Sequence, residues 1–380
     1  MEQNSLRDRI DEIDHKIVSL FGERMEVSKE IAAYKKEHHI PILDPARERE
    51  KLAAVAEASP EEIRDYTRTL YRMMFELSRS YQNKLNGSGT ALTERIQKAI
   101  DNTPKLFPES AFVACQGVEG AYSSLAADKL FRNANILFFN HFDAVFSAIE
   151  KGLCRYGVVP LENSTAGSVN SIYDLMMDHK FSIVRSIRLK IDHNLLAREG
   201  ATLDSIREIY SHQQAISQCG EFLQSLSNVK IIPCENTAVA AKMVASSDRT
   251  DIAALSSRSC IRQYGLKCLA ESVQDKDNNY TRFICISKNL EIYPGADRTS
   301  LMAILPHEAG SLYKTLAKFY ALGINLNKLE SRPLPNRDFE FMFYFDLDTP
   351  VYSPRFMQLM DELKSTSEKF SYLGSYSEVI

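Results

Sequence analysis

The sequence predicts a multidomain chain in which an all-α segment is followed by an α/β segment and then by an α+β segment. Residues 1–86 carry apolar side chains at helical spacing almost throughout. From residue 110, short β-rich runs alternate with helical stretches, and a β–α–β–β–α–β order occupies 298–378. The 380 residues suffice for this division, because single hydrophobic cores stop growing near roughly 250–300 residues.

Composition excludes several classes of protein. The 46 basic and 50 acidic residues give a net charge of −4, so no bulk positive field favours nucleic acid or an anionic membrane. The charged N-terminus lacks the apolar centre of a signal peptide, and no apolar run reaches the ~18 residues that a membrane span needs. The seven cysteines include no Cys-x-x-Cys pair, and the eight histidines lack metal-ligand spacing. We expect a reduced cytoplasmic protein without a metal site.

The first predicted element is a helix from residue 5 to the proline at 41, with apolar side chains three and four apart along one seam. A helix of about 34 residues spans roughly 50 Å. The shorter helices that follow cannot bury such a seam, so we expect at least a dimer in which two long helices pack together. The seam residues are Leu6, Ile10, Ile13, Ile17, Leu20, Val27, Ile31 and Tyr34.

Two further helices complete the all-α segment. One begins at Asp44 or Pro45, with the aspartate as N-cap and the proline at the first helical position, and runs to about residue 58. The "SPEE" stretch at 59–62 is expected to cap the other, which runs to about residue 84.

The helices also carry charged side chains that suggest a site for a small dianion. Arg24 interrupts the apolar seam, and a buried arginine is costly unless an anion meets it. Lys35, eleven residues later, returns to nearly the same face, whereas Arg7 points roughly a quarter turn away and would serve the site of a partner chain. On the third helix, Ser78 and Gln82 share a face.

This segment resembles the all-helical chorismate mutases over nearly its whole length, and Asp44, Arg47 and Glu48 of "DPARERE" fall at further site positions of that family. The resemblance implies that Arg24 and the partner's Arg7, aided by Ser78, hold the two carboxylates of chorismate. It also implies that Glu48 holds the ring hydroxyl, and that Lys35 and Gln82 donate to the ether oxygen. Arg47 and Glu48 should point inward, while Glu50 and Lys51 should be solvated.

Four polar motifs of the α/β segment lie at predicted strand ends, where open α/β sheets bind ligands. They are "QGVEGAYS" (116–123), "PLENSTAGS" (160–168), "YSHQQA" (210–215) and "NNYTRF" (278–283). The G-x-G-x-x-G pattern of a dinucleotide site is missing.

In this order and spacing, the four motifs resemble the prephenate dehydratases over 110–290, whose two α/β lobes surround a cleft as in periplasmic binding proteins. The resemblance implies that Thr281 assists departure of the ring hydroxyl while CO2 leaves, that Arg282 holds a carboxylate, and that no cofactor is needed. Gln213 stands where many members have proline, and His212 can be read either as a general acid or as a structural hydrogen-bonding residue. The remaining cleft residues would be Tyr122, Asn163, Ser164, Ser211 and Gln214.

The motifs "HEAGSLYKTL" (307–316) and "LESRP" (329–333) resemble the ACT domain, a ferredoxin-like regulatory domain whose effector in this setting is L-phenylalanine. Most members have alanine at the position of Ser311. The alternative without an effector site is that Gly310 only forms a turn before a helix and that Arg332 is a surface charge. The effector-binding candidates are Gly310, Ser311, Leu312, Glu330, Ser331 and Arg332.

These resemblances predict a bifunctional enzyme of phenylalanine biosynthesis, with a mutase domain at 1–86, a linker at 87–109, a dehydratase domain at 110–290 and a regulatory domain at 298–378. Chorismate would become prephenate and then phenylpyruvate, under feedback inhibition by phenylalanine. A two-lobed sensor with a fused mutase would share this architecture but would not need Thr281 for turnover. A mutase fused to a prephenate dehydrogenase would need the dinucleotide loop that the sequence lacks.

Overall fold

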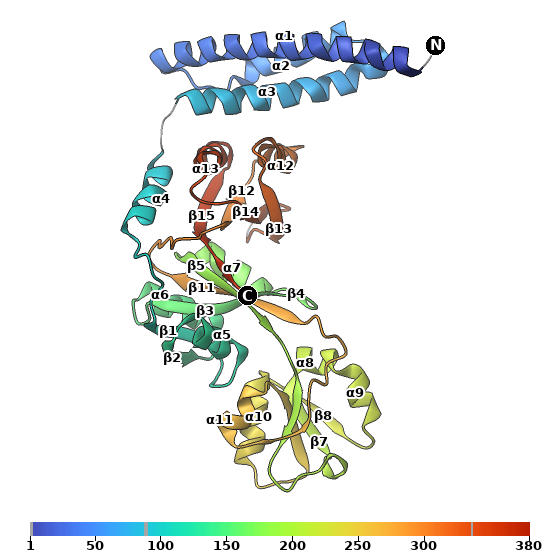
Figure 1. Cartoon of the computed structure of the whole chain (residues 1–380), viewed down its shortest axis with the longest axis vertical. Coiled ribbons are helices and arrows are strands. Elements are labelled where there is room, and N and C mark those ends of the chain that lie inside the picture. The colour runs from blue at the N-terminus through green and yellow to red at the C-terminus, as the bar shows by residue number, and fades with distance from the viewer. Residues whose placement is uncertain (1–2, 87–89, 336) are drawn as a thin grey trace.

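The computed structural model describes residues 3–86, 90–335 and 337–380 and shows an elongated molecule. A layer of three helices lies at one end, the C-terminal sheet with its two helices lies next to it, and two α/β lobes follow (Figure 1). No helix of these ranges combines the length and the apolar character needed to cross a membrane.

The helical layer consists of α1 (Gln3–Glu37), α2 (Pro45–Ala58) and α3 (Arg64–Asn86). Asp44 caps α2 as predicted, because its carboxylate accepts a hydrogen bond from the backbone N of Arg47 at 3.0 Å. The prediction that "SPEE" caps α3 is wrong. The Ser59 hydroxyl donates to the carbonyl of Val55 at 2.6 Å, and the 3-10 turn Glu61–Ile63 leads into α3 instead.

The predicted linker contains a helix, α4 (Ala91–Asn102). Its Ile96 and Ala99 are buried in one hydrophobic core with side chains of the C-terminal segment. The amphipathic stretch seen in the sequence is therefore packed, while the Gly-Ser-Gly break before it, 87–89, lies outside the described residues.

The first α/β lobe is built on a sheet with the strand order β16-β5-β11-β3-β1-β2, with β4 beside β3. Buried aliphatic and aromatic residues of β1, β3, β5 and β11 fill the space under its helices. Its strands are β1 (Ser110–Gln116), β2 (Asn133–Phe139), β3 (Tyr156–Asn163), β4 (Gly167–Ser168), β5 (Ser182–Lys190), β11 (Tyr280–Ser287) and β16 (Glu378–Val379), and its helices are α5 (Tyr122–Leu130), α6 (Phe142–Glu150) and α7 (Asn170–Asp178).

The second lobe has a five-stranded mixed sheet of order β10-β6-β9-β7-β8. The chain enters it after β5 and returns through β11, so two crossings connect the lobes. Its elements are β6 (Asn194–Ala197), η2 (Leu203–Ser205), β7 (Glu208–His212), α8 (Gln213–Gln218), α9 (Gly220–Ser225), β8 (Lys230–Cys234), α10 (Thr237–Ser246), β9 (Ile252–Ser256), α11 (Ser259–Tyr264) and β10 (Lys267–Ala270).

The C-terminal segment forms an antiparallel sheet of order β13-β14-β12-β15 in the predicted β–α–β–β–α–β sequence. It shares a core with the first lobe, since Met302, Tyr344 and Leu373 pack with residues of β3 and β11. Gly374 is required at this junction, because a Cβ there would lie 2.2 Å from the carbonyl oxygen of Ile183. The elements are β12 (Arg298–Ile304), α12 (Ser311–Ala321), β13 (Asn325–Pro333), β14 (Phe341–Asp348), α13 (Pro354–Thr366) and β15 (Lys369–Tyr376).

Candidate active sites

The seam between α1 and α3 brings several predicted mutase residues together. The Arg24 guanidinium donates a hydrogen bond to Ser78 Oγ and lies 5.9 Å from the centroid of the Phe75 ring. Gln82, one turn beyond Ser78 on α3, is buried, and its Oε1 has no hydrogen-bond partner among the described residues. The seam therefore combines a cation, a hydroxyl and an amide with spare hydrogen-bonding capacity.

Glu48 of α2 binds Arg79 of α3, a residue that sequence reasoning missed. Arg79 also pairs with Glu76 on its own helix. Burial alone would lower the pKa of Arg79, but Glu76 and Glu48 outweigh burial and raise it. The sequence did hold a sign of this pair, because residues 76 and 79 are three apart and so share a helix face.

Three predicted mutase residues lie elsewhere in the single chain. Lys35 donates from Nζ to the carbonyl of Ile42 at 2.6 Å. Arg47 does not point inward as expected, since it is exposed and pairs with Glu50 at 2.8 Å, three residues along the solvent face of α2. Arg7 is also exposed, and seventeen residues of helix place it about 25 Å from Arg24, so it cannot reach the same site.

A cavity of about 350 Å³ lies between the two α/β lobes, beside the crossings that connect them. The first lobe contributes the loop after β3, the second lobe contributes α8, and the returning chain contributes the segment before β11. Mostly polar side chains, one lysine and one aspartate surround it. The lining residues are Thr165, Ala166, Gln214, Ser217, Gln218, Gln274, Asp275, Lys276 and Asn279.

Asn163 is the centre of the hydrogen-bond network behind this cavity. Its Nδ2 donates to Thr281 Oγ1 at 2.9 Å and to Asn279 Oδ1 at 2.8 Å. Its Oδ1 accepts from Thr165 Oγ1 at 2.7 Å and from the backbone N of Ala166 at 2.9 Å. Asn163 and Thr281 face each other across paired strands, which fixes their separation.

Gln218 joins this network from the second lobe and was missed in the sequence. Its Nε2 donates to Thr165 Oγ1 at 2.7 Å, and its Oε1 accepts from Asn279 Nδ2 at 3.0 Å. The ring of His193 lies 3.0 Å from the same Oε1, and burial, partly offset by this hydrogen bond, lowers the pKa of His193. Gln218 lies four residues after Gln214, so helical spacing places both on the face that lines the cavity.

Three other predicted cleft residues donate hydrogen bonds to backbone carbonyls. Tyr122 donates to the carbonyl of Asp192 at 2.6 Å, Ser164 to that of Asn278 at 2.6 Å, and Ser211 to that of Leu255 at 2.8 Å. Burial raises the pKa of the Tyr122 phenol, which therefore stays protonated.

His212 makes a structural hydrogen bond, one of the two roles that the sequence allowed. Its Nδ1 accepts from the backbone N of Gln214 at 3.3 Å at the start of α8. Burial lowers the pKa of His212, which favours the neutral ring that this capping bond requires.

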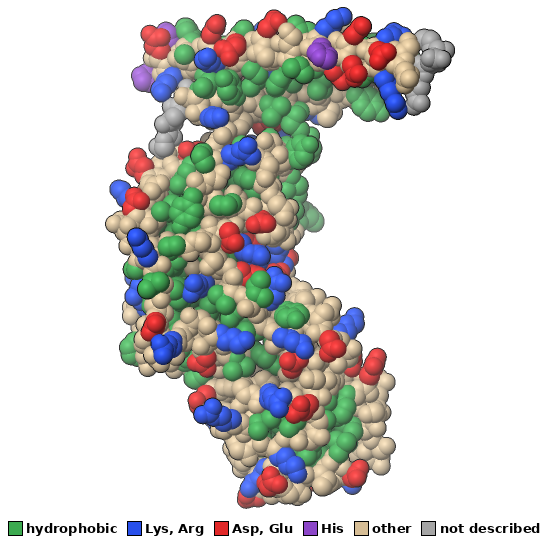
Figure 2. Space-filling model, viewed as in Figure 1, with side chains coloured by type: hydrophobic (Ala, Val, Ile, Leu, Met, Phe, Trp, Pro, Cys, Tyr) green, Lys and Arg blue, Asp and Glu red, His purple; other side chains and the backbone are tan. Residues whose placement is uncertain are grey.

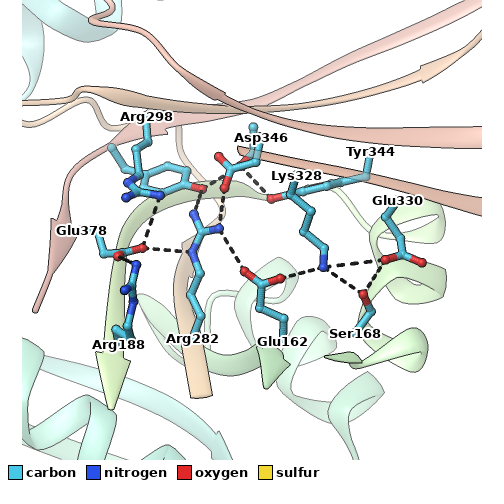
Figure 3. A network of polar contacts seen from close by, with 12 residues as sticks. Glu162, Ser168, Arg188, Arg282, Arg298, Lys328, Glu330, Tyr344, Asp346 and Glu378 are labelled. Atoms are coloured by element: carbon cyan, nitrogen blue, oxygen red, sulfur yellow. Dashed lines mark hydrogen bonds and ion pairs between the residues drawn. The ribbon is translucent and has the colours of Figure 1, made fainter. Parts of the chain in front are cut away.

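Arg282 lies on the face of β11 opposite to Thr281, so the expectation that it holds a substrate carboxylate is not met by this geometry. Successive strand side chains point to opposite faces, and it is Thr281 that joins the Asn163 network behind the cavity. The Arg282 side chain is 7% exposed and binds Asp346 of β14 and Glu378 of β16, and its Nη2 donates to Tyr376 OH at 3.0 Å (Figure 3).

The effector candidates form two groups. At the start of α12, Gly310 has φ +86°, the Ser311 hydroxyl is buried without a hydrogen-bond partner among the described residues, and Leu312 packs on the C-terminal core. On β13, Ser331 is exposed, while Glu330 and Arg332 contact the first lobe. Arg332 binds the Asp174 carboxylate through two hydrogen bonds of 2.9 Å.

Comparison with known proteins matches both catalytic segments. Residues 6–83 match the family model described as "Chorismate mutase type II", and residues 113–291 match "Prephenate dehydratase". The bifunctional chorismate mutase/prephenate dehydratase of Escherichia coli K12 is 31% identical over 98% of this chain and 95% of its own length. Arogenate dehydratase 2 of Petunia hybrida is 36% identical over 70% of this chain and 71% of its own.

A solved structure gives the same result for the fold. The prephenate dehydratase of Arthrobacter aurescens, in complex with L-Phe, has a TM-score of 0.64 and 28% identity over 70% of this chain and 90% of that chain. The α1–α3 seam and the two-lobed cleft lie within the two segments that match these families, so the chain joins an isomerase to a lyase. The chain belongs to the bifunctional chorismate mutase/prephenate dehydratase family and is an enzyme with both activities.

Proposed function

We propose that the α1–α3 seam converts chorismate to prephenate, that the interlobe cleft converts prephenate to phenylpyruvate, and that L-phenylalanine inhibits the chain through a C-terminal ACT domain. The single observation that carries most weight is the Asn163–Thr281 hydrogen bond beside the cavity. In this bond Thr281 Oγ1 is the acceptor, so its own proton remains available for donation to the substrate.

The mutase reaction is a Claisen rearrangement, which needs no nucleophile and no proton transfer. The protein contributes by holding a folded conformer of the substrate and by stabilising charge that develops on the ether oxygen. Arg24 next to Ser78 suits a carboxylate, Glu48 suits the ring hydroxyl, and the amide of Gln82 suits the ether oxygen. Lys35 would have to leave the carbonyl of Ile42 to assist Gln82.

A homodimer would complete this site. The apolar stripe of α1 described above is largely exposed, with Ile17 57% and Leu20 63% exposed. Figure 2 shows hydrophobic side chains on the visible face of the helical layer. An apolar stripe of this length is covered in a stable protein. A second α1 packed along it would bring the partner's Arg7 toward Arg24, which supplies the second cation that a dicarboxylate needs.

The dehydratase reaction breaks the bond between the ring carbon and its carboxylate, and the electron pair moves through the ring as the hydroxyl departs. Asn163 donates to Thr281 Oγ1, so the proton of the Thr281 hydroxyl is free to point toward the departing oxygen. A hydrogen bond there stabilises the negative charge that develops on the leaving group. Formation of an aromatic ring drives the reaction, so orientation and this donation suffice, without a cofactor.

Two opposite charges line the cavity, those of Lys276 and Asp275, so its formal charge is balanced. The Asp275 carboxylate accepts from the backbone N of Gly220 and Glu221 at the start of α9, which fixes its position. Among the described residues, Lys276 makes no such hydrogen-bonded contact to the backbone, and it suits a carboxylate of prephenate.

The ACT assignment rests on the element order of the C-terminal segment and on the L-Phe complex of the Arthrobacter relative. We propose that phenylalanine binds near the Gly310 turn and the 330–333 stretch, between two copies of this domain. A cytoplasmic location is supported by the cysteines, all of which are free. The net charge of −4 supports small-molecule rather than nucleic-acid or membrane partners.

The test supplies the purified chain with chorismate and no cofactor, and follows prephenate and phenylpyruvate with and without phenylalanine. We expect phenylpyruvate to form and its rate to fall when phenylalanine is added. Accumulation of prephenate alone would contradict the cleft assignment, and no conversion of chorismate would contradict the mutase assignment.

A further inference from the structure

The C-terminal sheet and the first lobe meet at a cluster of buried and partly buried charges, here called the interdomain charge cluster (Figure 3). It contains four basic and four acidic side chains, so its formal charge is balanced. Its members come from β3, β5, β11 and β16 on one side and from β12, β13 and β14 on the other. They are Glu162, Arg188, Arg282, Arg298, Lys328, Glu330, Asp346 and Glu378.

Burial of two carboxylates makes the cluster sensitive to the loss of any partner. Asp346 is 0% exposed and Glu378 is 3% exposed, and a buried charge that loses its partner is strongly destabilising. Lys328 of β13 reaches across the junction and donates to Glu162 Oε2 at 2.6 Å and to Ser168 Oγ at 2.9 Å. Burial alone would raise the pKa of Glu162, but Lys328 and Arg282 outweigh it and lower that pKa, so the carboxylate stays ionised.

The cluster is one residue away from the dehydratase network on both strands. Glu162 precedes Asn163 on β3, and Arg282 follows Thr281 on β11. The two strands pair Thr281 with Asn163 and Arg282 with Glu162, and the register shifts immediately after Arg282. Irregularities of this kind re-aim side chains beside active sites. The side chains of the cluster lie on the face of these strands that contacts the C-terminal sheet, and the side chains of the Asn163 network lie on the opposite face.

We propose that Lys328, in the C-terminal domain, is a positioning residue for the dehydratase reaction. By holding Glu162, it fixes the end of β3 and with it the alignment of Asn163 with Thr281. This inference rests on the proposed role of Thr281. Without Lys328, Glu162 keeps only the longer contact with Arg282 at 3.4 Å, and Arg282 is already held by Asp346 and Glu378.

The same strand offers a route for inhibition. Residues 328, 330 and 332 alternate along β13 and share one face, and each contacts the first lobe. Glu330 accepts a hydrogen bond from Ser168, and Arg332 binds Asp174. An effector that engages Glu330 and Arg332 competes with these contacts and draws Lys328 away from Glu162.

The test is Lys328→Met in the full-length chain, with prephenate as substrate. We expect kcat to fall about tenfold with KM changed less than about twofold, because a small misplacement of reacting groups lowers the rate without removing binding contacts. Lys328→Arg, which keeps the charge, should recover most of the rate. Arg337→Met is the matched control, because Arg337 pairs with Glu340 and Glu368 within the C-terminal domain and should leave the rate unchanged.

The outcomes separate this inference from the function it rests on. A wild-type chain that does not convert prephenate would contradict the proposed function itself. An active wild type with unchanged kcat in Lys328→Met would overturn the inference alone. A rise in KM with constant kcat, or a loss of rate that Lys328→Arg does not recover, would also overturn it, because either result indicates binding or general destabilisation rather than positioning.

Discussion

Replacing Thr281 by valine separates a catalytic hydroxyl from a structural one. The change keeps the shape of the side chain and removes the acceptor of one hydrogen bond from Asn163. Asn163 Nδ2 still donates to Asn279 Oδ1 at 2.8 Å and lies 3.2 Å from the carbonyl of Tyr280. The structural loss is therefore one neutral hydrogen bond, which contributes about 1 kcal/mol to stability.

The catalytic loss should be much larger. If the hydroxyl donates to the departing oxygen, its removal should lower kcat for prephenate by on the order of 10²–10⁴. The Tm should fall by only about 2–4 °C, the shift that about 1 kcal/mol produces in a domain of this size. Steady-state formation of phenylpyruvate and scanning calorimetry measure the two quantities on the same preparation.

Thr93→Val in α4 is the matched control, because it also removes one hydroxyl hydrogen bond, at 3.0 Å, from a buried threonine far from the cleft. It should lower Tm by a similar amount and leave kcat unchanged. The reasoning would be refuted by a loss of kcat in Thr281→Val smaller than about tenfold, since the hydroxyl would then contribute less than general acid–base assistance does.

Further predictions concern the dimer, the effector and pH. Ile17→Glu in the exposed apolar stripe of α1 should convert the proposed dimer to a monomer in analytical ultracentrifugation and reduce mutase activity while sparing the dehydratase; a stable, active dimer would contradict it. Arg332→Met should weaken inhibition by phenylalanine with basal kcat within about twofold, because half-exposed ion pairs contribute little to stability; unchanged inhibition would count against the effector site. Burial lowers the pKa of His193 below its ordinary value of 6.5, so the unfolded chain binds a proton more readily than the folded chain. Stability should therefore be lost as pH falls below about 6.5, by at most ~1.4 kcal/mol per pH unit for this group. Calorimetry of His193→Gln should show a shallower decline, and an equal decline would exclude His193 as the source.

Much of the fold follows from local sequence patterns. The spacing of three and four along α1, the Asp44–Pro45 start of α2 and the β–α–β–β–α–β order of the C-terminal segment all depend on residues close together in the chain. Such features are set by periodicity and by hydrogen bonds of short sequence separation, so a sequence alone carries them.

The sites were predictable in part, and the errors have physical causes. The position of Arg282 beside Thr281 suggested the cleft, but strand alternation sends the two side chains to opposite faces, and the outer face is covered by Asp346, 64 residues later in the chain. Gln218 became recognisable only when α8 brought it over the loop after β3. The short strand β16 could not be predicted, because its pairing with β5 joins residues nearly 200 positions apart.

The orientation of Arg47 illustrates a different limit. Its spacing from Asp44 and Glu48 fits the family pattern, yet in the single chain it pairs with Glu50, the nearest carboxylate on the exposed face. Exposed ion pairs contribute little to stability, so this contact holds Arg47 only weakly. Helical spacing leaves Arg47 near several carboxylates and does not select among them, so the sequence could not predict which one it binds.

The central claim, that one chain carries two separate active sites, is tested most directly by giving Arg24→Met each substrate in turn. Arg24 lies in the helical layer, remote from the interlobe cleft (Figure 1). The variant should form phenylpyruvate from prephenate at the wild-type rate and form almost none from chorismate. Arg68→Met, which removes only an exposed pair with Asp65, should behave as wild type with both. Loss of both activities in a folded Arg24→Met chain, or retention of both, would contradict the account.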